Sequence, residues 1–187
     1  MNFFQAIILG IVQALTEYLP VSSSAHIRII GDLMLGADPG AAFTAIIQIG
    51  TELAVILYFR RDIINILSHW FGCLFGKNGP DWRARMGRGD KYATLGWNVI
   101  VGSIPIIILG FTLQNIIETS LRNLWITVTV LFLFGLLLWI VDARSRQIKT
   151  MDDMNYRDAF LFGLGQSMAL IPGVSRSGGT ITVEAVI

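Results

Sequence analysis

The sequence contains few charged residues, little histidine and almost no cysteine. Only 14% of its 187 residues are Asp, Glu, Lys or Arg, whereas about 25% are charged in a typical soluble domain. The mean hydropathy is +0.63. One cysteine, Cys73, excludes an internal disulfide framework and a cysteine-rich metal site. A net charge of +1, with the basic residues in loops, argues against a nucleic acid partner. The composition therefore predicts an integral membrane protein.

Three apolar runs are each long enough to cross a membrane. A helix of about 20 residues spans the hydrocarbon layer of a bilayer, which is about 30 Å thick. The runs extend over Ala41–Phe59, Leu95–Ile117 and Leu121–Val141.

Two shorter apolar runs, Phe3–Leu19 and Phe160–Ile171, end at Pro20 and Pro172. A helix broken by proline or glycine at membrane depth is tolerated only where the freed backbone groups are buried in protein or line a wet cavity. Both runs therefore predict half-helices beside a functional site.

The connections between the spans differ in charge. Segment 60–93 is rich in Lys and Arg, so the positive-inside rule places it in the cytoplasm. The connection Asp142–Arg157 is expected on the same side, and the turn Glu118–Asn123 outside. Within the first connection, Ile63–Phe75 is too short for a span and suits an interfacial or packed segment. We expect His69 to be a structural or interface residue.

The two broken segments resemble each other. Gln13–Ser24 and Gln166–Ser177 each place Gln, then Pro, then a group of hydroxyl residues at nearly the same spacing, with a slip of one residue. Because three spans separate them, the copies would enter the membrane from opposite sides. We therefore expect an all-α polytopic membrane protein with inverted-topology repeats and broken, re-entrant helices. Its single domain, 1–187, would comprise repeat 1 (about 1–59), the basic connection (about 60–93), spans (about 95–141) and the start of repeat 2 (about 156–187).

The sequence ends inside the apolar run Thr180–Ile187, without a cap, a charge cluster or a stop. A second copy of the material after Ser24 would be expected to follow. We therefore expect repeat 2 to be incomplete.

Glu17 is an ionisable residue within an apolar segment, which is costly in lipid and indicates function. Gln13 lies one helical turn before it, so two oxygen-bearing side chains share a helix face. Hard oxygen ligands suit Mg²⁺ or Ca²⁺ bridging a phosphate. The structural alternative is a buried carboxylate paired with Arg28 or Arg176.

The segment after Pro20 holds three hydroxyls, Ser22, Ser23 and Ser24, and the imidazole of His26. Ser23 and His26 are three residues apart, so a helix start could bring nucleophile and base together. Ordinary helix capping by the serines is an equal alternative.

The segment after Pro172 has the composition of an anion site. Glycines let backbone N–H groups approach an anion, hydroxyls add donors, and the guanidinium of Arg176 fits two phosphate oxygens. A salt bridge from Arg176 to Glu17 is the structural alternative. Gln48 and Gln166 could line the same cavity. The expected phosphate-binding residues are Ser22, Ser24, Gly173, Ser175, Ser177 and Thr180.

These motifs resemble those of the undecaprenyl pyrophosphate phosphatases of the bacitracin-resistance type. The resemblance rests on Gln13-x-x-x-Glu17, on Pro20-x-Ser22-Ser23-Ser24-x-His26 and on Pro172-Gly-x-Ser175-Arg176-Ser177, and it extends over the whole chain. Gln13 stands where many members have Glu.

The resemblance implies a bacterial inner-membrane enzyme that removes the terminal phosphate from C55 isoprenyl pyrophosphate with a divalent cation. It further implies recycling of the lipid carrier for cell-wall synthesis, bacitracin resistance and an active site on the extracytoplasmic side. It also implies catalytic roles for Glu17, Ser23, His26 and Arg176. We expect Ser23 to be the nucleophile, activated by His26; an activated water is the rival. A polyprenyl-phosphate transporter with the same inverted-repeat site is the alternative function.

Overall fold

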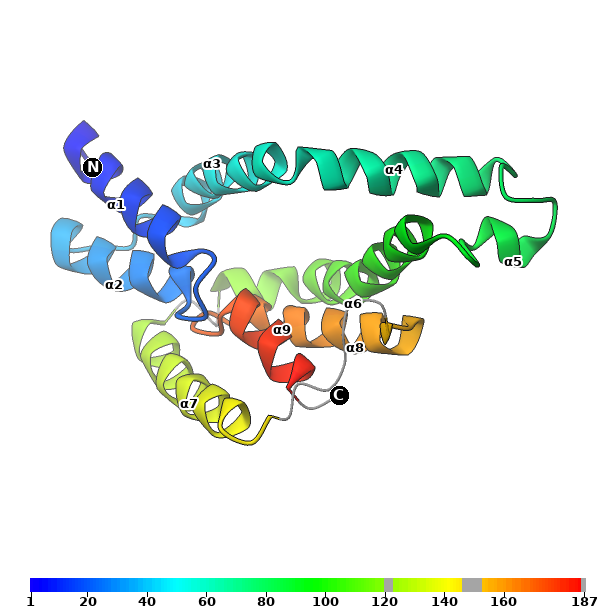
Figure 1. Cartoon of the computed structure of the whole chain (residues 1–187). Helices are drawn as coiled ribbons and strands as arrows, with labels where there is room; N and C mark the ends of the chain where they lie inside the picture. The colour runs from blue at the N-terminus through cyan, green and yellow to red at the C-terminus, as the bar shows by residue number, and fades with distance from the viewer. Residues whose placement is uncertain (120–122, 146–152, 186–187) are drawn as a thin grey trace.

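The structure, a computed structural model, describes residues 1–119, 123–145 and 153–185, and these are helical without any β-strand. Figure 1 shows the helices in chain order. They are α1 (Phe3–Thr16), α2 (Ser23–Leu35), α3 (Ala41–Tyr58), α4 (Arg60–Leu74), α5 (Trp82–Arg85), α6 (Lys91–Thr119), α7 (Leu124–Asp142), α8 (Tyr156–Ser167), the 3₁₀ turn η2 (Met168–Leu170) and α9 (Arg176–Glu184).

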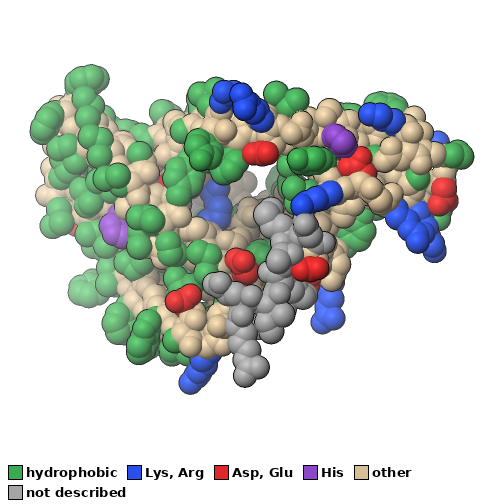
Figure 2. Space-filling view, in the orientation of Figure 1, with side chains coloured by type: hydrophobic (Ala, Val, Ile, Leu, Met, Phe, Trp, Pro, Cys, Tyr) green, Lys and Arg blue, Asp and Glu red, His purple; other side chains and the backbone are tan. Residues whose placement is uncertain are grey.

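Three helices are long and apolar enough to cross a membrane: Ala41–Tyr58, Lys91–Ile117 and Leu124–Asp142. They confirm the three predicted spans, although α6 begins earlier than the apolar run, and positions 121–122 of the third lie outside the described residues. Their apolar side chains face outward; Phe111 on α6 is 84% exposed and Phe132 on α7 is 71% exposed. Hydrophobic side chains also cover α1 and α2 in Figure 2. An all-α polytopic membrane protein accounts for this surface.

Each predicted half-helix forms one arm of a helical hairpin. α1 breaks before Pro20 and returns as α2, and α8 breaks around Pro172 and returns as α9. The two hairpins face each other tip to tip, opening toward opposite ends of the molecule (Figure 1). At the tips, the Ser175 and Ser177 hydroxyls of the second hairpin donate to the Leu19 carbonyl of the first, at 3.4 and 3.0 Å.

The repeat is longer than its sequence signal, and its helix caps show where the expected one-residue slip lies. Asn2 caps α1 and Asn155 caps α8, each with a capping box. Ser22 caps α2 and Ser175 caps α9. Counted from the caps, Gln13 corresponds to Gln166 without an insertion, whereas the two prolines differ by one position. The slip therefore lies at the prolines, and the glutamines and capping serines are in register.

The basic connection between the first two spans contains two helices. α4 follows α3 after Phe59, extends over the apolar stretch expected to pack, and lies against α6. The Trp70 ring contacts Trp97, with centroids 5.4 Å apart, and a Cβ at Gly96 would lie 2.9 Å from Trp70. Lys and Arg side chains gather toward the α5 end (Figure 2). The structure does not describe Arg146 and Lys149 of the second connection. It also leaves out most of the turn Glu118–Asn123, either the residues or their side chains.

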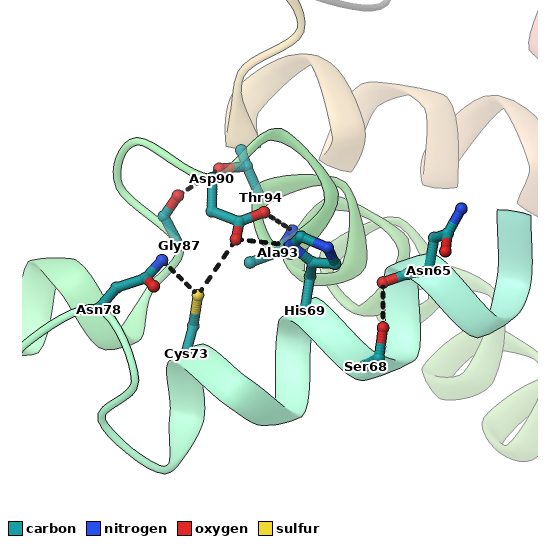
Figure 3. A network of polar contacts seen from close by, with 9 residues as sticks. All are labelled: Asn65, Ser68, His69, Cys73, Asn78, Gly87, Asp90, Ala93 and Thr94. Atoms are coloured by element: carbon teal, nitrogen blue, oxygen red, sulfur yellow. Dashed lines mark hydrogen bonds and ion pairs between the residues drawn. The ribbon is translucent and has the colours of Figure 1, made fainter.

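A polar cluster fixes the end of α4 to the start of α6 (Figure 3). His69 Nδ1 lies 2.8 Å from Asp90 Oδ2, and Asp90 Oδ1 accepts a hydrogen bond from the Ala93 amide in the first turn of α6. Cys73 is buried beside Asp90, and Asn78 donates to its sulfur. His69 thus has the structural position expected for it.

The cluster shifts the pKa values of two of its groups in opposite directions. Burial alone would raise the pKa of Asp90, but the hydrogen bonds from His69 and Ala93 outweigh it and hold that pKa below its usual range. Burial, reinforced by the Asp90 charge, raises the pKa of the Cys73 thiol. Cys73 is therefore a neutral, packed thiol and not a reactive one.

Glycines permit close helix crossings around the second hairpin. A Cβ at Gly163 on α8 would collide with the Gly102 carbonyl of α6, and one at Gly165 would lie 2.7 Å from the Gly179 carbonyl of α9. Small residues at crossings are how helices approach in lipid, where burial gives no drive for association.

We expect acid to weaken the α4–α6 contact. A carboxyl with a lowered native pKa contributes stability that is present above its unfolded pKa, about 3.9, and is lost as the pH falls through the native value. The wild type should therefore lose part of its thermal stability between about pH 5 and pH 3. Asp90→Asn should be less stable at neutral pH and lose less on acidification. Asp81→Asn, whose side chain makes no cap hydrogen bond, is the control, and thermal unfolding in detergent is the measurement.

The repeat offers a matched pair for the glycine crossings. Gly10 on α1 corresponds to Gly163 on α8, yet a Cβ at Gly10 would meet nothing within 4 Å. Gly163→Ala should cost about 1–3 kcal/mol through overpacking against α6, measured by denaturation in mixed micelles. Gly10→Ala should be neutral or stabilising because alanine favours a helix. Equal effects at both positions would contradict the crossing.

Candidate functional site

The carboxylate of Glu17 lies where α1 ends and joins two predicted site residues. Gln13 Nε2 donates to Glu17 Oε2 at 2.7 Å, and Ser23 Oγ donates to the same oxygen at 2.6 Å. Gln13 lies in the last turn of α1 and is 2% exposed. Ser23 is the first residue of α2. The helix break therefore brings an acid and a hydroxyl from the two arms of one hairpin together.

These three residues line a cavity of about 130 Å³ between the hairpin tips and α3, which we call the hairpin cavity. Arg176 reaches it from the second hairpin. Gln48 reaches it from α3 and donates to Glu52. The lining comprises Gln13, Glu17, Ser23, Ser24, Thr44, Gln48, Ala169, Val174, Ser175 and Arg176.

Two helices begin at this cavity. Ser23 and Arg176 occupy the same repeat position, the first residue of α2 and of α9. The preceding residues, Ser22 and Ser175, cap these helices by accepting from Ala25 and Gly178 amides. The first N–H groups of a helix have no acceptor within it and carry partial positive charge, so both ends favour an anion.

Arg176 is exposed to the cavity side. The predicted structural alternatives for Glu17 are absent, because neither Glu17 nor Arg176 takes part in an ion pair within the described part of the chain. Arg28 instead lies 3.2 Å from Asp38. Both ionisable groups therefore remain available within one cavity.

The expected pairing of Ser23 with His26 is not formed. His26 Nδ1 donates to the Ser22 carbonyl at 2.9 Å, one turn back in α2, and His26 does not line the hairpin cavity. The three-residue spacing cannot bring the imidazole to Ser23, because Ser23 opens the helix with its hydroxyl directed at Glu17. Glu17, and not His26, is the base within reach of that hydroxyl.

Several expected phosphate ligands have structural partners. Ser24 lines the cavity, with its hydroxyl 3.2 Å from that of Ser22. Ser177 donates to Leu19, and Thr180 donates to the Ser177 carbonyl in its own helix. Capping, the alternative for the serines after Pro20, thus holds for Ser22, and Ser175 also caps a helix.

Two backbone positions at the tips are unusual. Ser22 has φ of 62°, which among the described residues is otherwise found only at glycines. Gly173 has φ of 103° and lies against α7, where a Cβ would touch the Leu131 amide at 3.0 Å. Gly173 therefore positions the second tip.

Gln166, expected as a possible cavity residue, lies on α8 and does not line the hairpin cavity. Thr44 and Ala169 line the cavity without any motif in the sequence to indicate them.

One buried atom bears on the predicted metal. Gln13 Oε1 is buried without a hydrogen-bond partner, beside the Glu17 carboxylate. No group of three or more His, Cys, Asp or Glu side chains able to hold a metal occurs in the described ranges. Mg²⁺ is commonly held by one or two protein ligands together with water and substrate phosphates. The donor set fits such a cation and does not fit one enclosed by protein ligands.

The fold and cavity define an integral membrane protein whose polar site lies between two facing, broken hairpins. The chain belongs to the family described as bacitracin resistance protein BacA, whose model matches residues 6–187.

Relatives share high identity over most of this chain. The chain is 89% identical over 183 residues to an undecaprenyl-diphosphatase of Bifidobacterium longum subsp. infantis, covering 98% of this chain and 62% of the relative. Identity is 71% over 182 residues to that of Bifidobacterium adolescentis, covering 97% and 62%. It is 53% over 186 residues to that of Paenarthrobacter aurescens, covering 97% and 63%. The chain thus spans somewhat less than two thirds of these relatives.

Proposed function

We propose that the protein to which this chain belongs hydrolyses undecaprenyl pyrophosphate to undecaprenyl phosphate and inorganic phosphate. The observation that carries the proposal is the meeting of Glu17, Ser23 and Arg176 in one cavity at two helix N-termini. The family supports it, as do the relatives, which are undecaprenyl-diphosphatases by name. The reaction would recycle the lipid carrier of cell-wall synthesis and confer bacitracin resistance.

The diphosphate would lie in the hairpin cavity with Arg176 on its phosphoryl oxygens. A planar guanidinium and two helix N-termini neutralise an anion and orient it, which supplies most of the catalysis in phosphoryl transfer. The two helix N-termini are fixed by the hairpin tips, so their N–H groups need little rearrangement as charge develops.

Ser23 Oγ would attack the terminal phosphorus while its proton passes to the Glu17 carboxylate, to which it is already hydrogen-bonded at 2.6 Å. A new Oγ–P bond forms, the bridging P–O bond breaks, and the lipid monophosphate leaves. Water then attacks the phosphoserine and releases inorganic phosphate. In the rival path, Glu17 deprotonates a water that attacks phosphorus directly.

A divalent cation, Mg²⁺ or Ca²⁺, would be held by Gln13 Oε1 and Glu17 and would neutralise charge on the diphosphate. The cation would give a partner to Gln13 Oε1, which is buried without a hydrogen bond.

The isoprenyl chain would remain in the lipid. A cavity of about 360 Å³ shares Glu17 and Arg176 with the hairpin cavity and is otherwise lined by Tyr18, Thr51, Glu52, Val55 and Ile56. We call it the Val55 groove. It adjoins the exposed apolar side of α3, where Ile56 is 51% exposed and Leu57 is 63% exposed. The site would lie in the bacterial plasma (inner) membrane and face the extracytoplasmic side.

Phosphate release from a polyprenyl diphosphate in detergent tests the function. We expect release by the protein extended to the length of its relatives, with weaker release by the 187-residue chain. Arg176→Gln should lower kcat at least about 100-fold, the usual loss when one group that stabilises developing charge is removed. Ser23→Ala removes the proposed nucleophile and should lower kcat at least as much. Labelled phosphate should be trapped on Ser23 of the wild type by acid quenching.

The control is Arg61→Gln, an exposed arginine on α4 that lines neither the hairpin cavity nor the Val55 groove. No release by the intact protein, in micelles where no gradient exists, would favour the transporter. Full activity of Ser23→Ala would leave only the water path.

Chelation tests the cation. Removal of divalent ions should abolish phosphate release, and Mg²⁺ or Ca²⁺ should restore it. Gln13→Glu should need less cation for half-maximal activity because a second carboxylate adds charge to the ligand set. Gln13→Leu should need more. Gln166→Leu, at the corresponding position of the other repeat, is the matched control. A cation requirement unchanged by both Gln13 variants would exclude Gln13 as a ligand.

A further inference from the structure

A third cavity adjoins the hairpin cavity on the side away from the Val55 groove. We call it the Arg28 cavity; its volume is about 190 Å³. It shares Ser24, Thr44 and Ala169 with the hairpin cavity, and it shares no lining residue with the Val55 groove. The three spaces therefore follow one another, with the reacting groups in the middle.

Arg28 has unused hydrogen-bonding capacity. Its Nη1 lies 3.2 Å from Asp38 Oδ2 in an ion pair without hydrogen-bond geometry, and its Nε is shielded from solvent without a hydrogen-bond acceptor. The side chain is 21% exposed and the residue lines the cavity. A shielded cationic N–H without an acceptor is unfavourable, so a ligand that supplies oxygen acceptors would be stabilised here.

The rest of the lining suits a small oxyanion. Ser24 and Thr44 line both this cavity and the hairpin cavity, and the Thr44 hydroxyl donates to the Gly40 carbonyl. The rest of the lining includes Thr127 and the apolar side chains of Ile27, Ile117, Leu170 and Pro172. A guanidinium fork with neighbouring hydroxyls matches a tetrahedral anion. Asp38, on the same lining, offsets part of the Arg28 charge, which favours weak and reversible binding.

We propose that the Arg28 cavity is a second phosphate site, which receives the inorganic phosphate set free in the hairpin cavity. The proposal rests on the proposed hydrolysis for the origin of its ligand. It separates the two products: the lipid monophosphate remains on the side of the Val55 groove, and the phosphate passes Ser24 and Thr44 in the opposite direction.

Direct binding tests the site without catalysis. Inorganic phosphate is titrated calorimetrically into the detergent-solubilised protein, with no lipid substrate present. Arg176→Gln should retain phosphate binding, and adding Arg28→Gln to it should weaken the remaining affinity at least about ten-fold, because charge-assisted hydrogen bonds are lost. Arg61→Gln is the matched control. Unchanged phosphate affinity on adding Arg28→Gln would overturn the proposal.

A variant that should strengthen phosphate binding separates loss of the site from misfolding of the protein. Asp38→Asn removes the acidic neighbour and should tighten phosphate binding. Weaker phosphate binding in Asp38→Asn, with a normal unfolding midpoint, would also contradict the proposal.

Steady-state kinetics distinguish free phosphate from a lipid head group. Arg28→Gln should raise the inhibition constant of inorganic phosphate and leave KM for the polyprenyl diphosphate unchanged. A raised KM with unchanged phosphate inhibition would assign the cavity to the lipid and overturn the proposal. If the wild type hydrolyses nothing, the proposed function fails, while the calorimetric result still decides whether the cavity binds phosphate.

Discussion

The hydrogen bonds between the hairpin tips are the contact on which the site depends. The helix break before Pro20 frees the Leu19 carbonyl, and a backbone carbonyl inside a membrane needs a donor from protein or water. The Val21 amide donates to it at 2.8 Å within the same tip, and the Ser175 and Ser177 hydroxyls of the other hairpin donate to it as well. The broken backbone of one repeat is thus also bound by the other repeat, and Ser23 and Arg176 line the same cavity.

Close packing keeps the second tip in register with the first. Gly173 lies against the backbone of α7, Gly178 faces Phe134, and Gly163 crosses α6, in each case without room for a Cβ. Contacts of this kind depend on shape, since a helix surrounded by lipid gains nothing from burying apolar area. The polar cavity is therefore held by backbone proximity, and the outer, lipid-facing surface can remain apolar (Figure 2).

The spans, the two breaks and the residues Glu17, Ser23 and Arg176 could be predicted from the sequence, because hydropathy and costly polar residues are local signals. The partner of Ser23 could not, since it depends on where α1 ends relative to α2. The three-residue spacing predicted that His26 would lie beside the Ser23 hydroxyl, whereas in the structure this hydroxyl donates to Glu17 and His26 contacts the Ser22 carbonyl. Thr44 lies in a span whose sequence gives no sign of a site, and the repeat register became visible only through its caps.

The equivalence of Ser23 and Arg176 gives the site an approximate twofold character. Each begins a helix, each follows a capping serine, and each is followed by a serine, Ser24 or Ser177. The backbone presents the same anion-binding arrangement twice, while the side chains differ: one carries a hydroxyl and the other a fixed positive charge. Two like halves with unlike chemistry match the proposed diphosphate substrate, of which one phosphoryl group would be cleaved and the other kept.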